Sequence, residues 1–333
     1  MAFPREGRTL GATSAEREAG YAAWSAVARA VAEFAPVTMI SDPSETSRAR
    51  AMLGDAVEIV EHPLAEFWLR DSGPSFVFDA KGTLHAVDWI FNGWGGQDWT
   101  EGARDDGLAA VIADIAGARR VPSLLVNEGG GFHVDGDGTV LLTETVQRDP
   151  GRNPHASRER IEAEMARTTG AHKAIWLPRG LSRDYEPLGT RGHVDIVATF
   201  TEPGRLLLHH QPDPAHPDQV LTAQLRDQLA QETDARGRRL EIVDLPAPPV
   251  LRDASGFVDY SYVNHLVCND GVIACGFGDA QADARAATIL SEVYPGRRVT
   301  VVDAREIFAR GGGVHCITQQ QPAPPGAAPK ERP

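Results

Sequence analysis

One short pattern recurs along the chain: a hairpin-like pair of strands, a helix and a further strand-like apolar run. The helical stretches and the runs that follow them are 108–115 and 121–126, 158–168 and 174–177, 218–232 and 240–245, and 280–293 and 299–302. The pattern returns every ~50 to 70 residues, a period typical of repeat architectures. The repetition therefore predicts a single α/β domain of weak internal repeats rather than two unrelated domains.

Turn residues and a helix-start motif near the N-terminus support this interpretation. Asp-Gly and Pro-Gly pairs separate three predicted hairpins, which are 132–134 with 139–142, 194–200 with 206–209, and 262–268 with 272–274. Thr13 and Glu16 have the spacing of a capping box, and the apolar residues that follow recur every three or four positions. We expect a helix there, a strand at 37–40, a folded domain over 1–322 and a disordered Pro/Ala-rich tail over 323–333.

The balance of charge argues against several partners. The chain has 33 Lys and Arg against 46 Asp and Glu, which gives a net charge of -13. Nucleic acids and anionic membrane surfaces are bound largely by neutralising phosphate, so this balance disfavours both and mildly favours a cationic ligand. No run approaches ~20 apolar residues, and the N-terminus has no apolar signal core. We expect a cytoplasmic protein.

A triple glycine near the C-terminus points to a nucleophile. Gly311–Gly313 precedes His315 and Cys316. Glycine allows backbone angles that other residues avoid and leaves space beside the next side chain. A cysteine presented in this way can be approached by a substrate and can attack it as a thiolate. The other two cysteines, Cys268 and Cys275, lie in apolar strand-like runs, where small buried thiols are expected.

Other polar residues occupy similar glycine-rich junctions, namely Asp71, Glu128, His193 and Asp195. A repeat array gathers such junctions at one end of its axis, which would bring these side chains near the cysteine. Each has a structural alternative. Asp71 could form a surface ion pair or cap a turn, Asp195 could cap a turn, and His193 could be a buried, hydrogen-bonded histidine.

The combination suits one substrate class. A guanidinium group is planar and permanently charged, and carboxylates can bind its edges bidentately. Its carbon is a poor electrophile, so fixing the cation between carboxylates favours attack by a thiolate. An imidazole can then protonate the departing nitrogen and activate water for hydrolysis of the thiouronium-type intermediate. The residue types together predict a guanidine hydrolase.

Two other classes remain open on these residues alone. The first is a metalloenzyme, whose ligands would come from His133 and Asp135, His193 and Asp195, and the pair His315 and Cys316. Their spacing matches no familiar ligand array. The second is a non-catalytic protein of the same fold that binds a guanidino ligand or a protein partner. A binding protein has no use for a thiol nucleophile, which argues against it.

Several longer motifs carry a family resemblance. They are the segments WLRDSGP at 68–74, FNGWGG at 91–96, EGGGFHVDG at 128–136, GHVD at 192–195 and GGGVHCITQQQP at 311–322. In this order the chain resembles the agmatine deiminase family, which also contains bacterial-type peptidyl-arginine deiminases. The resemblance covers residues 1–322. It implies the five-bladed α/β-propeller, or pentein fold, with five ββαβ-type units around a pseudo-fivefold axis.

The resemblance also implies roles for the candidate residues. Cys316 would be the nucleophile and His193 the general acid and base. Asp71 and Asp195 would clamp the guanidinium, and Glu128 would orient or charge His193. The implied reaction is hydrolysis of agmatine to N-carbamoylputrescine and ammonia, a step of polyamine synthesis, with arginine or peptidyl arginine as alternative substrates. No metal or organic cofactor is implied, and a homodimer is compatible with the family.

The far end of the substrate is less defined. The ammonium group of agmatine needs a carboxylate or an aromatic face, and Glu66, Trp68 and Trp94 are the candidates, with Gly313 beside the nucleophile. Arginine or peptidyl arginine would instead need a partner for a carboxylate or an open cleft. The family usually has a further stretch before the element in which Met1 lies, so we expect a short N-terminal segment to be missing.

Overall fold

The computed structural model describes residues 1–324, and four of its sheets share one topology. Two strands form an antiparallel hairpin, and a helix then leads to a third strand that pairs in parallel with the second. The four units are β3 (Ser75–Phe78), β4 (Leu84–Ile90), α5 (Leu108–Ile115) and β5 (Arg119–Val126); β6 (Phe132–Val134), β7 (Thr139–Thr143), α7 (Arg158–Thr169) and β8 (Lys173–Leu177); β9 (Ala198–Glu202), β10 (Arg205–His210), α8 (Asp218–Leu229) and β11 (Glu241–Pro246); and β14 (Leu266–Cys268), β15 (Gly271–Gly276), α9 (Ala280–Val293) and β16 (Arg298–Asp303).

A fifth unit stands at the N-terminus. Its strands β1 (Thr38–Ser41) and β2 (Glu58–Glu61) pair in parallel around α2 (Thr46–Leu53), and Ala2 forms a β-bridge to Ile40. The preceding helix α1 (Ser14–Ala32) begins with the predicted capping box. The backbone N–H of Glu16 donates to Thr13 Oγ1 over 3.2 Å, and the backbone N–H of Thr13 donates to Glu16 Oε2 over 2.8 Å.

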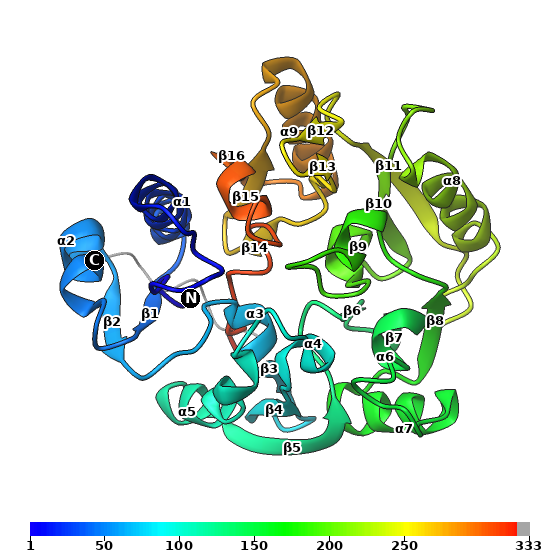
Figure 1. Cartoon of the computed structure of the whole chain (residues 1–333). Coiled ribbons are helices and arrows are strands. Elements are labelled where there is room, and N and C mark those ends of the chain that lie inside the picture. The colour runs from blue at the N-terminus through cyan, green and yellow to red at the C-terminus, as the bar shows by residue number, and fades with distance from the viewer. Residues whose placement is uncertain (325–333) are drawn as a thin grey trace.

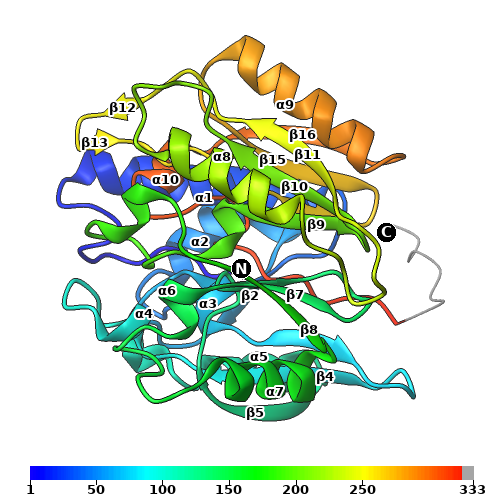
Figure 2. The same cartoon turned by 90° about the vertical axis from the view of Figure 1, so that its right-hand side faces the viewer.

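The units follow one another around a common centre, with the longer helices on the outside (Figure 1). In the view turned by 90°, α9 and α7 lie at opposite ends of the molecule (Figure 2). The first and last units meet, because α1 packs against β16 and α10 (Arg305–Phe308). Arg310 fastens this contact, since its side chain donates to the carbonyl oxygens of Leu10, over 2.8 Å, and Glu16.

Short elements occupy the connections within and between the sheets. They are α3 (Leu69–Ser72), α4 (Gly93–Gly96), α6 (Glu144–Gln147), the 3-10 turns η1 (Gly54–Ala56), η2 (Gly102–Asp105), η3 (Ser182–Tyr185) and η4 (Val194–Ile196), and the small hairpin β12 (Arg252–Asp253) and β13 (Gly256–Phe257). The main core contains Trp24, Phe67 and Trp68, whose rings contact one another. Connections that pass over such a core hold their side chains in fixed places, which suits a catalytic site.

The mixed α/β class and most predicted elements are confirmed. The helices at 108–115 and 280–293 have the predicted bounds. Two predicted strands are partly wrong. Residues 194–196 form η4 instead, because the backbone N–H groups of Val194 and Asp195 both donate to the carbonyl of Gly130. Residues 262–265 precede β14 rather than belonging to it. The predicted disordered tail lies outside the described residues from 325 onward.

Candidate active site

The five residues predicted to carry the chemistry lie in connections that different units supply. Asp71 belongs to α3, Glu128 lies between β5 and β6, His193 and Asp195 stand at η4, and Cys316 follows α10. All five are buried, with at most 6% of any residue exposed. The structural alternative of a surface ion pair at Asp71 is therefore wrong. The neighbouring Arg70 instead turns toward the C-terminal segment and donates to the carbonyl oxygen of His315 over 3.2 Å.

Gly130 joins three of these connections through its backbone. Its N–H donates to Asp71 Oδ1 over 3.1 Å, and its carbonyl accepts from Val194 and Asp195. A Cβ at Gly130 would overlap His193 Nδ1 and would lie 3.1 Å from Asp195 Oδ2. Only glycine fits there, so the glycine run after Glu128 allows the backbone to approach the histidine closely.

His193 lies between two carboxylates. Its Nε2 is 3.4 Å from Glu128 Oε2, and its Nδ1 is 3.9 Å from Asp71 Oδ1. Burial alone would lower the pKa of His193, but the charges of Asp71, Glu128 and Asp195 outweigh burial and raise the pKa to about 9. The imidazole is therefore protonated at neutral pH. Its buried Nδ1 has no hydrogen-bond partner within residues 1–324.

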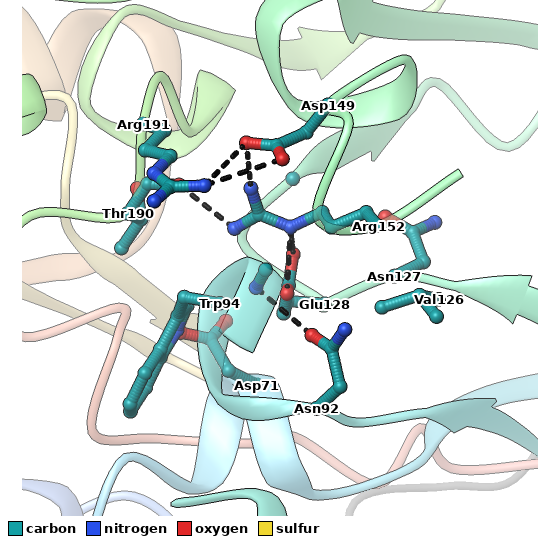
Figure 3. A network of polar contacts seen from close by, with 12 residues as sticks. Asp71, Asn92, Trp94, Val126, Asn127, Glu128, Asp149, Arg152, Thr190 and Arg191 are labelled. Carbon is teal, nitrogen blue, oxygen red and sulfur yellow. Dashed lines mark hydrogen bonds and ion pairs between the residues drawn. The ribbon is translucent and has the colours of Figure 1, made fainter. Parts of the chain in front are cut away.

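Glu128 has its own cation, as Figure 3 shows. Arg152 Nε lies 2.9 and 3.0 Å from the two carboxylate oxygens, and neither side chain is exposed. Arg152 also bonds Asp149 Oδ2 over 3.2 Å and the carbonyl of Thr190 over 2.7 Å. Burial acts to raise the pKa of Glu128, but Arg152 and His193 act more strongly and hold that pKa below its ordinary value. This carboxylate is therefore ionised. Its negative charge is available to hold His193 in the protonated form.

Asp71 is fixed by an indole. Trp94 Nε1 donates to Asp71 Oδ2 over 2.9 Å. Trp94 is a non-glycine residue with positive φ, at φ 55° and ψ 48°, inside the irregular α4. This uncommon backbone conformation directs the indole of Trp94 toward the Asp71 carboxylate. Burial raises the pKa of Asp71 to about 6.

Cys316 lies beside Asp195 and Asn264. Its Sγ is 3.4 Å from Asp195 Oδ2 and 3.2 Å from the side-chain nitrogen of Asn264. Burial, followed by the charges of Asp195 and Asp71, raises the pKa of the Cys316 thiol well above its ordinary value. The thiol form therefore predominates in the free protein at neutral pH.

Asp195 connects this cysteine with a polar cavity. His315 Nδ1 lies 2.7 Å from Asp195 Oδ2, while Asp195 Oδ1 is buried and has no partner among the described residues. Burial raises the pKa of Asp195, but the hydrogen bond from His315 helps to lower it overall. Asp195 and His315 line a cavity of about 170 Å³ together with His133, His265, Tyr294 and other residues.

Three of the four additional substrate-binding candidates, Trp68, Trp94 and Glu66, lie in different surroundings. A Cβ at Gly312 would meet Trp68 at 2.8 Å and Cys316 Sγ at 2.9 Å, so Trp68 lies beside Cys316. Trp94 reaches the site through its bond to Asp71. Glu66 bonds Thr9 and Thr100 through Oε1, whereas its buried Oε2 has no hydrogen-bond partner in the described part of the chain. Burial raises the pKa of Glu66 to about 7.

Several residues of the site were missed from sequence. They are Arg152, Asp149, Asn264 and Asp184, the last of which accepts from the backbone N–H groups of Thr190, Gly192 and His193. Asp149 and Arg152 lie in a Pro- and Gly-containing segment, which predicts a turn but does not indicate a catalytic or binding role. From the sequence, the only role predicted for the His315 side chain is that of a metal ligand. In residues 1–324, no group of three or more His, Cys, Asp or Glu side chains is arranged to hold a metal ion.

The chain matches the family profile of Porphyromonas-type peptidyl-arginine deiminases over residues 1–322. A Streptomyces coelicolor protein provisionally named agmatine deiminase is 55% identical, over 97% of this chain and 95% of its own. An Ectopseudomonas mendocina protein named agmatine deiminase is 40% identical, over 92% and 88%. The solved structure of an Enterococcus faecalis agmatine deiminase is 31% identical with a TM-score of 0.88, over 97% of this chain and 92% of that one. No helix in the described residues is long and apolar enough to cross a membrane.

Proposed function

The chain belongs to the Porphyromonas-type peptidyl-arginine deiminase family, and we propose that within this family it hydrolyses agmatine to N-carbamoylputrescine and ammonia. It is a hydrolase of guanidino C–N bonds. The observation that carries the proposal is the convergence of a buried thiol, a protonated imidazole and three carboxylates on one point. Relatives named for agmatine support the choice of substrate.

The carboxylates prepare a place for a cation. Asp71 and Asp195 approach His193 from the side of Gly130, and Asp195 Oδ1 has no other partner in residues 1–324. A guanidinium bound between the two carboxylates would satisfy that oxygen through charge-assisted hydrogen bonds. Its positive charge would also offset the negative charges that raise the pKa of the Cys316 thiol. Substrate binding therefore promotes formation of the thiolate.

The reaction then follows in two halves. The Cys316 thiolate adds to the guanidinium carbon, and the proton of His193 goes to one departing nitrogen, which leaves as ammonia. The neutral imidazole next takes a proton from water, whose hydroxide adds to the thiouronium carbon. The carbon–sulfur bond breaks, the thiolate leaves, and the resulting protonated urea passes its extra proton to that thiolate, which replaces the proton that the thiol released to solvent when the substrate bound. Glu128, held by Arg152, stabilises the protonated His193 in both halves.

The proposal extends to the whole chain. The five units around one centre are proposed to be the blades of a five-bladed α/β-propeller that spans residues 1–322 as one catalytic domain of a cytoplasmic enzyme. The connections before β3, β6 and β9 supply Asp71, Glu128, and the pair His193 and Asp195. Such an arrangement places residues from distant parts of the sequence at one end of the axis.

Ammonia release from agmatine, arginine and an arginine-containing peptide, measured in parallel, tests the proposal. Agmatine alone is expected to react. Release from arginine or the peptide instead would support the proposed reaction but contradict agmatine as its substrate. Absence of release from all three would contradict the proposed function. Cys316→Ala, assayed beside the unaltered protein, shows how much ammonia comes from contaminating enzymes.

A further inference from the structure

The triple glycine before Cys316 makes room for one buried amide. A Cβ at Gly313 would overlap Oδ1 of Asn264, and a Cβ at Gly312 would lie 2.9 Å from Cys316 Sγ. Asn264 lies before β14, and none of its surface is exposed. The chain therefore keeps side chains away from the space in which this amide and the sulfur meet.

Two backbone groups fix the orientation of the amide. The backbone N–H of His315 donates to Asn264 Oδ1 over 2.9 Å, so that atom must be the oxygen. The Asn264 nitrogen donates one hydrogen to the carbonyl of Asp195 over 3.3 Å. Its second hydrogen is left for Cys316 Sγ, at 3.2 Å. The assignment of nitrogen and oxygen, which is otherwise ambiguous, follows from these partners.

These contacts give Asn264 two tasks. It connects the segment that carries Asp195 with the segment that carries Cys316, and it directs a neutral N–H donor at the sulfur. The two charged groups that act most strongly on this sulfur, Asp195 and Asp71, are negative and disfavour the thiolate. A donor bond to an ionised group is stronger than one between neutral groups, so the bond from Asn264 strengthens as the sulfur ionises.

We propose that Asn264 is a further catalytic residue, which positions Cys316 against Asp195 and stabilises its thiolate through the side-chain N–H. The kinetic part of this inference rests on the proposed function, whereas the effect on the thiol does not. The backbone N–H of Gly313 provides a second donor to the same sulfur. The two donors act on the cysteine as the donors of an oxyanion hole act on a developing alkoxide.

Alkylation of Cys316 by iodoacetamide over a pH series, followed by mass spectrometry of the Cys316 peptide, tests the proposal without substrate. Asn264→Ala removes the donor. The thiol pKa is expected to rise by about one unit, which slows alkylation below that pKa about threefold, because the smaller thiolate fraction is partly offset by higher nucleophilicity. Asn264→Asp has nearly the same shape and places a carboxylate oxygen near the sulfur, so it should slow alkylation more.

Turnover of agmatine by the same variants supplies the second readout. With either variant we expect kcat to fall ~100-fold, as for loss of one oxyanion-hole donor, with a much smaller change in KM. Asn269→Asp is the matched control, because Asn269 is exposed on the β14–β15 turn and bonds the carbonyl of Phe34. It should leave both readouts unchanged.

Alkylation at an unchanged or faster rate in Asn264→Ala would overturn the proposal. If turnover falls while the alkylation profile stays unchanged, Asn264 has a merely structural role. If Asn264→Ala does not fold, Asn264→Asp decides the matter by the same criteria. Inactivity of the unaltered protein toward agmatine would instead contradict the proposed function and leave the alkylation result standing.

Discussion

The two sides of the site differ in how their charges are balanced. On the His193 side, defined by His193, Glu128 and Arg152, the buried carboxylate has a buried guanidinium at 2.9 Å. On the Cys316 side, defined by Cys316, Asp195 and Asn264, the sulfur is surrounded by carboxylates and receives only neutral donors. The first side has its cation at hydrogen-bonding distance in the free protein, whereas on the second side Arg70 bonds the His315 carbonyl and acts on Asp195 through its charge, and the substrate is proposed to bring a further cation.

Cys316→Ala should have the largest effect. Loss of the nucleophile is expected to reduce turnover by a factor of at least ~10⁴, since the covalent route is removed. Agmatine should still bind, because Asp71 and Asp195 remain in place. Calorimetric titration and ammonia release measure the two quantities on the same sample. Residual turnover within tenfold of the unaltered protein would show that another group attacks the carbon.

Arg152→Met should damage the His193 side most. It leaves Glu128 buried without its cation, and breaking a buried pair in this way costs ~3–5 kcal/mol of stability. Arg191→Met is the control, because Arg191 is partly exposed and its ion pair with Asp149 is expected to contribute ~0–1 kcal/mol. Unfolding in urea compares the two variants. Equal losses would mean that burial of the Glu128 pair has no special importance.

Glu128→Gln should change the pH dependence of turnover. The pKa of His193 is raised to about 9, so kcat/KM should fall as the pH rises through that value and the proton is lost. Without the charge of Glu128 this pKa is lower, and the alkaline limb should move to lower pH by at least about one unit. An alkaline limb that stays in place would indicate that another group supplies the proton.

His315→Ala should have the smallest effect. It removes the 2.7 Å partner of Asp195 without changing the residues proposed to react. Loss of one charge-assisted bond predicts a fall of about tenfold in kcat/KM. In His315→Asn, the amide nitrogen can take the place of Nδ1, so part of the loss should be restored. Equal activities of the two variants would argue against a positioning role for this bond.

Local signals predicted the parts of the fold that local contacts determine. The capping box before α1 and the turn residues of the β6–β7 hairpin are contained in a few neighbouring residues. The composition of residues 194–196 predicts a strand, which is wrong. Their N–H groups bond Gly130, which is 64 and 65 positions away, and no local pattern reveals that contact.

The same reasoning applies to the site. Cys316, His193 and the three carboxylates stand at glycine-rich junctions, so residue type and position indicated them. Arg152 and Asn264 act through partners 24 and 52 positions away. An arginine in a turn and an asparagine near a strand are common in any sequence. Their roles follow from the three-dimensional contacts alone.

The contact between the first and last units also has a consequence for folding. Arg310, which joins α10 to the segment before α1, lies six positions before Cys316. We therefore expect the contact between the first and last units and the placement of the thiol to form together, since both join distant parts of the chain. A partly folded intermediate with an open ring would have Asp71 and His193 within its formed units but no sulfur beside them. We expect such an intermediate to be unreactive toward guanidines, because the thiol would not yet lie beside the other groups of the site.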